Sequence, residues 1–239
     1  MKEMWDKKAA NYPRFTGEPS VFHRGLYAKI AEFGVKFEGK SVVDIGCGTG
    51  VHTLFLAQIC REITGMDISG EMLKVMVEDA AKFNISNLTA VQSDFKNFNP
   101  NRVYDVAFST MSPAIADEED FVKFINLGKK RVYLWWNKPR YSSVLELFYE
   151  DSQRGCFKEK ANFFEEYLRR ENIAFNSCVL EEFREQKRTL EEMTQNALWH
   201  LQIANFTYDE NAVRSRLESI AQDGYVTEKI VSSMKLLVF

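Results

Sequence analysis

The sequence has few of the residues that build metal centres and disulfide frameworks. It contains 4 cysteines and 3 histidines in 239 residues. The cysteines show no paired ligand spacing, and no histidine is spaced with another ligand type as a zinc site requires. We therefore expect no bound metal. We interpret the thiols as reduced and mostly buried, as in a cytosolic protein; they are Cys47, Cys60, Cys156 and Cys178.

Long apolar runs and a strong excess of one charge are also missing. No apolar run approaches membrane-spanning length, and the charged, polar N-terminus has no signal-peptide core. A formal net charge of −3 offers no electrostatic footprint for nucleic acid, although a local basic patch could hide within that total. We expect a cytoplasmic monomer or homodimer with no membrane or nucleic-acid partner. A content of 45% hydrophobic and 27% charged residues excludes a disordered chain.

The most informative segment that is present is a glycine-rich turn at residues 42–50, Val-Val-Asp-Ile-Gly-Cys-Gly-Thr-Gly. A short β-branched run ends at Asp44, three alternate glycines follow, and an apolar helical pattern begins at Val51. Glycines leave no Cβ in the way of a ligand, and amide groups at a helix start attract negative or polar atoms. The pattern predicts a nucleotide-type site at the end of a first strand. A G-x-G-x-x-G dinucleotide fingerprint would need glycine at Val51, so a dehydrogenase is disfavoured.

Three more strand-like runs follow the glycine turn, and two of them end at an acid. Ile63–Met66 precedes Asp67, and Leu88–Gln92 precedes Ser93-Asp94-Phe95. The third of these runs covers residues 104–109. Because Asp67 and Asp94 both follow strand ends, we do not interpret the glycine segment as a tight turn with a purely structural role.

The D-x-G-x-G-x-G loop and these runs, in this order, resemble the class I S-adenosylmethionine-dependent methyltransferases. The resemblance implies S-adenosyl-L-methionine as cofactor and S-adenosyl-L-homocysteine as product. It implies that Asp67 binds the ribose hydroxyls, that Asp94 accepts from the adenine amino group, and that Asp44 orders the loop or meets the methionine ammonium through water. The implied cofactor-binding set is Tyr12, Asp44, Gly46, Cys47 (through its backbone), Gly48, Thr49, Gly50, Asp67, Ile68, Met72, Ser93, Asp94, Phe95 and Ser109.

Alternating strand and helix patterns predict an α/β fold. We expect a Rossmann-like, doubly wound, mostly parallel seven-stranded sheet with an antiparallel C-terminal strand and helical lid additions. Helices are expected at residues 5–12, 20–33, from Ser69 onward, 117–127 (ended by Gly128), from Ser143, Asn162 and Thr189, and at 209–222. Further strands are expected at residues 131–136, 175–188 and 231–239, the last antiparallel beside the fifth strand.

We interpret the chain as a single methyltransferase domain. Within it, residues 1–35 form an N-terminal helical cover and 36–136 the cofactor-binding core. Residues 137–223 form insertions for the substrate or a lid, and 224–239 the terminal strand. The segment from Trp5 to Tyr12 resembles the opening of many small-molecule methyltransferases, where it lies over the cofactor.

Only the absence of certain motifs limits which classes of methyl acceptor are possible. The loop at residues 109–115 lacks the Asn/Asp-Pro-Pro-aromatic motif with which amino-methylating nucleic-acid enzymes hold a flipped base. We favour a small-molecule acceptor over a protein side chain, with N-, O-, S- and C-methylation all open. Candidate substrate residues are Met111, Trp136, Trp199 and His200, each of which also fits an ordinary packing role.

No catalytic residue can be identified, because a sulfonium methyl group is already a strong electrophile and transfer needs mainly alignment. A non-catalytic protein that binds S-adenosylmethionine or S-adenosylhomocysteine remains an alternative, and an RNA or protein methyltransferase is a weaker one.

Overall fold

A computed structural model describes residues 2–149, 160–204 and 206–239 of the chain. The chain divides into two compact units. Unit 1 comprises Met1–Trp135, Lys160–Val179 and Lys235–Phe239, and unit 2 comprises Trp136–Glu159 and Leu180–Met234. Strands β5 (Gly128–Trp136), β7 (Asn176–Thr189) and β8 (Tyr225–Val238) contribute residues to both units. Cys156, one of the four thiols considered above, lies outside the described residues.

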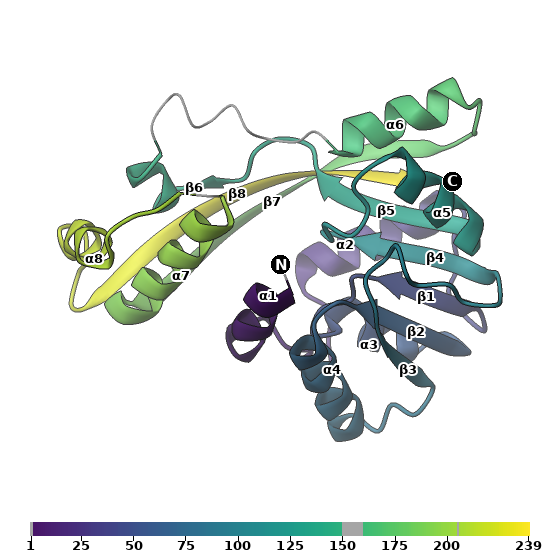
Figure 1. Ribbon diagram of the computed structural model, residues 1–239, viewed down its shortest axis with the longest axis horizontal. Coiled ribbons are helices and arrows are strands. Elements are labelled where there is room, and N and C mark those ends of the chain that lie inside the picture. The colour runs from purple at the N-terminus through teal and green to yellow at the C-terminus, as the bar shows by residue number, and fades with distance from the viewer. Residues whose placement is uncertain (1, 150–159, 205) are drawn as a thin grey trace. The chain divides into compact units, whose positions relative to one another are not determined.

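The strands form a mixed sheet in the order β3-β2-β1-β4-β5-β8-β6, with β7 also paired to β8 (Figure 1). The remaining strands are β1 (Ser41–Ile45), β2 (Glu62–Asp67), β3 (Leu88–Gln92), β4 (Tyr104–Thr110) and β6 (Tyr141–Ser142). Strands β1 to β5 are parallel. Reciprocal backbone hydrogen bonds between Arg131 and Phe239 place β8 antiparallel beside β5. The predicted fold class is confirmed, with eight strands in the sheet rather than seven because the short β6 is added to it.

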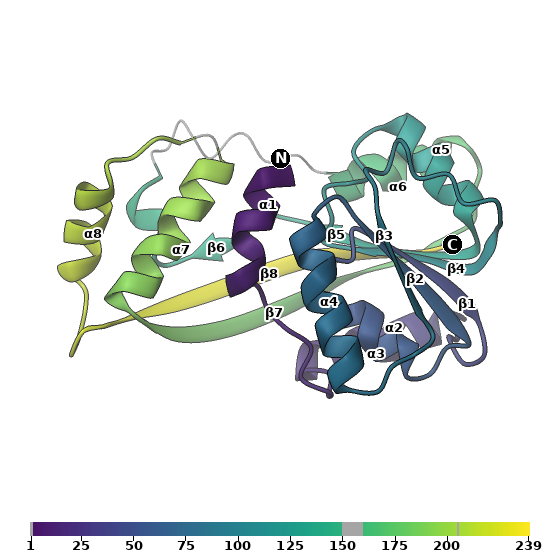
Figure 2. The same cartoon turned by 60° about the horizontal axis from the view of Figure 1, so that its bottom comes forward.

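Helices cover both faces of the parallel strands in unit 1. Figure 2 shows α5 (Glu118–Leu127) and α6 (Lys160–Arg170) on one face, and α2 (Val21–Glu32), α3 (Val51–Ala57) and α4 (Gly70–Lys82) on the other. Alternation along β1 sends Val43 and Ile45 into the core beneath α5 and α6, where the rings of Phe121 and Phe164 stack. Asp44 therefore points to the opposite face, toward α3.

Local capping explains where several helices begin. The hydroxyls of Ser20 and Ser69 accept hydrogen bonds from the backbone of the first turn of α2 and α4, as does the carboxylate of Asp117 in α5. These three helix starts are confirmed. Gly128 ends α5, as predicted, in extended conformation, and β5 begins there instead of at residue 131. A Cβ at Gly128 would lie 2.5 Å from the backbone nitrogen of Ala107 on the neighbouring strand.

At the N-terminus, the expected helix at residues 5–12 is instead α1 (Lys2–Lys8) followed by the 3₁₀ turn η1 (Ala9–Asn11). Within the described residues, no helix is both long and apolar enough to span a membrane.

Unit 2 contains β6, the 3₁₀ turn η2 (Leu145–Leu147), α7 (Leu190–Ile203), α8 (Glu210–Glu218) and parts of β7 and β8. The helix start expected at Thr189 is confirmed, and Thr189 and Glu192 form a capping box at the start of α7. The helix expected from Ser143 is only η2. Strand β8 begins at Tyr225, not at residue 231, because Asp223 and Gly224 both have positive φ and close a two-residue hairpin turn.

Candidate cofactor site

The glycine loop lies at the carboxyl edge of the parallel strands. In the strand register Ile45 pairs with Met66 and Asp67 pairs with Gln92, so β1, β2 and β3 end side by side. The backbone amides of Gly46 and Cys47 both donate to the carbonyl of Met66, at 2.7 and 3.0 Å. These bonds fix the start of the loop against β2.

All three glycines of the loop have positive φ, but their side chains are missing for different reasons. A Cβ at Gly46 would lie 1.8 Å from Ser112 Oγ, and one at Gly50 would lie 2.3 Å from Met76 Cγ. A Cβ at Gly48 would meet only the ring of Tyr12, at 3.8 Å. The protein's own packing therefore excludes side chains at Gly46 and Gly50. Of these three loop glycines, only Gly48 has room for a side chain above its Cα.

Asp67 holds the middle of this loop with its carboxylate. The amide of Gly48 donates to Oδ2 at 2.9 Å, and the amide of Ser69 donates to Oδ1 at 2.8 Å. Burial raises the pKa of Asp67, while these amides oppose the rise. An ionised carboxylate has about four acceptor positions, so each oxygen can still accept one further hydrogen bond.

Asp94 follows β3 and is fixed by its own turn. Its Oδ1 accepts from the amide of Asn97 at 2.8 Å, and its Oδ2 accepts from the side-chain amide of Asn97 at 2.7 Å. These hydrogen bonds lower the pKa of Asp94, so it is an ionised acceptor at neutral pH. Ser93 connects this turn to β2, because its amide donates to the carbonyl of Asp67 at 3.0 Å.

Asp44 is almost fully buried beneath the loop. Thr53 Oγ1, in α3, donates to Asp44 Oδ2 at 2.6 Å. Burial raises the pKa of Asp44 to about 7, with the nearby charge of Asp67 adding to the effect. The hydrogen bond from Thr53 ties β1 to α3, and the charge of Asp44 is sensitive to its surroundings near neutral pH.

The N-terminal segment is tied to the same edge of the sheet. Thr49 donates a hydrogen bond from Oγ1 to the carbonyl of Pro13, and Ser69 donates from Oγ to Asp6 Oδ1 at 2.6 Å. Arg14 forms a two-pronged ion pair with the buried carboxylate of Asp79, at 2.7 and 3.0 Å. These contacts hold the ring of Tyr12 near Gly48.

The other residues of the implied cofactor set contribute mostly buried surface. Met72, Phe95 and Ser109 are at most 3% exposed, and the hydroxyl of Ser109 donates to the carbonyl of Ile45. Ile68 and the side chain of Cys47 are half-buried. Burial raises the pKa of the Cys47 thiol well above its usual value, which favours its neutral form.

The four candidate substrate residues fall in both units. Met111 lies in unit 1 directly after β4 and has a positive φ of 51°, which is uncommon for a residue with a side chain. Trp136, Trp199 and His200 belong to unit 2. The rings of Trp199 and His200 lie 4.8 Å apart on α7. Arg140 Nη1 lies 3.4 Å from His200 Nε2, an arrangement that suits an unprotonated imidazole nitrogen.

Sequence reasoning missed three residues at this edge. Ser112 packs against Gly46, Asp6 accepts from Ser69, and Arg14 pairs with Asp79. A signal existed only for Asp6, which lies in the N-terminal pattern that suggested a cover. The position of Ser112 depends on the left-handed backbone of Met111, which no sequence pattern reveals.

Comparison with known proteins agrees with this geometry. Residues 42–128 match the family described as a methyltransferase domain. An uncharacterized protein of Haemophilus influenzae is 30% identical over 133 residues, which cover 54% of this chain and 48% of that protein. Pavine N-methyltransferase of Thalictrum flavum is 30% identical over 94 residues, covering 38% of this chain and 26% of that enzyme. The matched segment thus spans less than half of either relative, and other matching relatives include RNA methyltransferases.

Among solved structures, the YcgJ protein of Bacillus subtilis has the same fold. Its TM-score is 0.54 at 14% identity, over 90% of this chain and 98% of that one. The matched residues 42–128 include the glycine loop, Asp67 and Asp94. Residues 42–128 therefore match a methyltransferase domain, and this match supports S-adenosylmethionine as the cofactor.

Proposed function

We propose that this protein transfers the methyl group of S-adenosylmethionine to a small-molecule acceptor by direct in-line displacement. The observation that carries the proposal is the pair of carboxylates that follow β2 and β3 beside a loop in which Gly48 leaves its backbone uncovered. The cofactor supplies an electrophilic methyl group when bound, so the protein needs to provide alignment rather than a reactive side chain.

The residues at this edge suit the parts of the cofactor. Asp67 keeps one free acceptor position on each oxygen, which matches the two donor hydroxyls of a ribose. Asp94, ionised and partly exposed, suits an amino group that donates. Asp44 could stabilise a positively charged ammonium group by ionising, directly or through water. Tyr12 and the segment that carries it would exclude water from the bound cofactor.

A small acceptor is supported by chemistry and by one relative. The segment after β4 has no Asn/Asp-Pro-Pro-aromatic motif, and the net charge of −3 does not favour a polyanion. Pavine N-methyltransferase, by its name, acts on a small molecule. Met111 is our candidate for acceptor contact in unit 1, since strained backbone is often retained at functional sites. Trp136, Trp199 and His200 are the corresponding candidates in unit 2.

Turnover tests this proposal. The purified protein is incubated with S-adenosylmethionine labelled in its methyl group, together with a metabolite extract, total RNA or a peptide pool. We expect label in a small-molecule fraction and formation of S-adenosylhomocysteine. Label found in RNA or peptide instead would contradict the acceptor class. Tight cofactor binding without label in any fraction would favour the non-catalytic binding protein.

A further inference from the structure

Unit 2 surrounds one buried carboxylate with guanidinium groups. Glu228 of β8 is 0% exposed. Its Oε2 lies 3.2 Å from Arg188 Nη1, and its Oε1 lies 3.6 Å from Arg140 Nη2. The hydroxyl of Ser142 also donates to Oε1. Two cations share this single buried anion, so the group as a whole keeps one positive charge.

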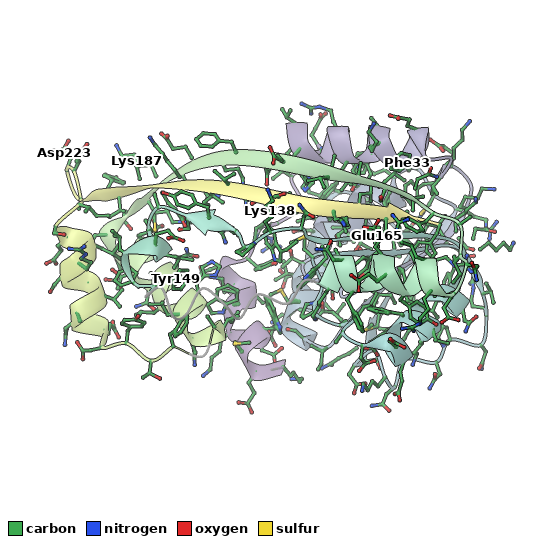
Figure 3. The ribbon with its side chains drawn as sticks, turned by 90° about the horizontal axis from the view of Figure 1, so that it is seen from above. Phe33, Lys138, Tyr149, Glu165, Lys187 and Asp223 are labelled. Atoms are coloured by element: carbon green, nitrogen blue, oxygen red, sulfur yellow. The ribbon has the colours of Figure 1, made fainter. Side chains whose placement is uncertain are left out.

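A third arginine lies on the same face of β7. Residues two apart along a strand share a face, so Arg184 and Arg188 are on one side and Lys187 is on the other. Figure 3 shows Lys187 and Tyr149 on opposite sides of the long strands. Burial chiefly, and then the positive charges of Arg184 and Arg188, lower the pKa of Arg140. Arg184 is therefore near enough to add to the same positive field.

The nearest acid does not fully satisfy this third arginine. Glu182 Oε2 lies 3.2 Å from Arg184 Nε. Even so, among the residues that the structure describes, Arg184 Nε and Arg140 Nε are buried and have no hydrogen-bond partner. The hydroxyl of Ser232, which is 0% exposed and lies on the same face of β8 as Glu228, also has none there.

The unpaired Nε atoms of Arg140 and Arg184 indicate which kind of ligand could bind to this arginine cluster. A guanidinium group only donates hydrogen bonds, so its partner must bring acceptor oxygens. A planar guanidinium fork matches the oxygens of a carboxylate or a phosphate, and a negative charge on that partner would offset the excess positive charge. The side chains of Arg188 and Arg184 are 31% and 41% exposed, so a group arriving from solvent can reach them.

We propose that Arg140, Arg184 and Arg188 bind a carboxylate or phosphate group of a small molecule. We further propose that this molecule is the methyl acceptor. This assignment of the acceptor rests on the function proposed above. The acceptor would then be anionic, and unit 2 would select it by charge.

The test uses the intact chain and two simple anions. Inorganic phosphate and succinate are titrated separately into the protein by calorimetry, at constant ionic strength and without cofactor. We expect saturable binding of one of them, and which one binds distinguishes phosphate from carboxylate recognition. Arg184→Gln should weaken this binding about ten- to a hundredfold, as for the loss of hydrogen bonds to a charged group. Arg184→Lys should recover part of it, because the charge returns without the planar fork.

The matched control is Arg214→Gln, also in unit 2. Arg214 is paired at the surface with Glu191 and Glu218, so its replacement should leave anion binding unchanged. Absence of saturable binding to the native protein, or equal binding by Arg184→Gln, would overturn the proposal. Methyl transfer is measured separately. If anions bind but no acceptor is methylated, the acceptor role fails and the anion site stands.

Discussion

At the scale of single residues, the three glycines of the loop are surrounded by different neighbours. A side chain at Gly46 would clash with Ser112, and one at Gly50 would clash with Met76. A side chain at Gly48 would only contact the ring of Tyr12. The sequence pattern predicts a ligand against all three. The structure requires the first and third for internal packing, so only the middle glycine is free to be explained by a ligand.

The positions of Asp67 and Asp94 could be predicted because a strand that ends in an acid is a local pattern. The contacts of Asp44 could not, since Thr53 reaches it from the next helix and burial then raises its pKa. The ion pair between Arg14 and Asp79 joins residues far apart in the chain, and neither residue carries a local signal.

Asp44 leads to a prediction about stability and pH. Its pKa is about 7 in the folded protein against an ordinary value of 3.8, so its stabilising contribution is complete below pH 3.8 and is lost as the pH rises through 7. Asp44→Asn removes this titration while keeping an oxygen for Thr53. Between pH 5 and pH 8, its free energy of unfolding should therefore rise relative to the native protein by about 2–3 kcal/mol. Urea denaturation at several pH values measures this difference.

Asp105 provides the control for that measurement. Hydrogen bonds from Ser41 and the ammonium group of Lys129 hold the pKa of Asp105 below its ordinary value. Asp105→Asn should therefore shift stability by the same amount at pH 5 and pH 8. His52, whose pKa burial lowers to about 3, is present in all these proteins and cancels in the comparison. Parallel curves for Asp44→Asn and the native protein would contradict a raised pKa.

At the scale of elements, those with local start signals could be predicted and those set by distant pairing could not. The capped helices α2, α4, α5 and α7 begin where Ser20, Ser69, Asp117 and Thr189 indicate, because a cap is a bond between near neighbours. Strand β8 is longer than expected, because its added residues alternate between exposed and buried but place Glu228 at a buried position between Val226 and Ile230, which interrupts the apolar pattern.

The N-terminal element gives the second prediction. Asp6 accepts a hydrogen bond from Ser69, at the start of α4, and this contact helps hold α1 and η1 in place. Asp6→Ala should make cleavage by trypsin after Lys7, Lys8 or Arg14 roughly tenfold faster, the effect of losing a hydrogen bond to a charged group. Saturating S-adenosylmethionine should slow cleavage of the native protein, as expected of a cover.

Lys2→Gln is the matched control, since it removes only the surface ion pair to the same Asp6. Its cleavage rate should match that of the native protein. Equal rates for Asp6→Ala and the native protein would show that α1 is held by other contacts.

At the scale of the whole molecule, the fold class follows from the alternation of strands and helices, and the match to a methyltransferase domain covers residues 42–128. The division into two units does not follow from the sequence, because strands β5, β7 and β8 run through both without a linker. Unit 1 carries the proposed cofactor residues, and unit 2 carries the arginine cluster. The two functions assigned to them can therefore be measured separately.

The central claim is that the loop containing Gly48, together with Asp67, binds S-adenosylmethionine. Calorimetric titration of the native protein and of Asp67→Ala with S-adenosylmethionine tests it most directly, with Asp105→Asn as the control for a lost surface carboxylate. We predict that Asp67→Ala weakens binding by roughly 1–3 kcal/mol while Asp105→Asn leaves it unchanged. Equal affinity of Asp67→Ala and the native protein for the cofactor would contradict the account.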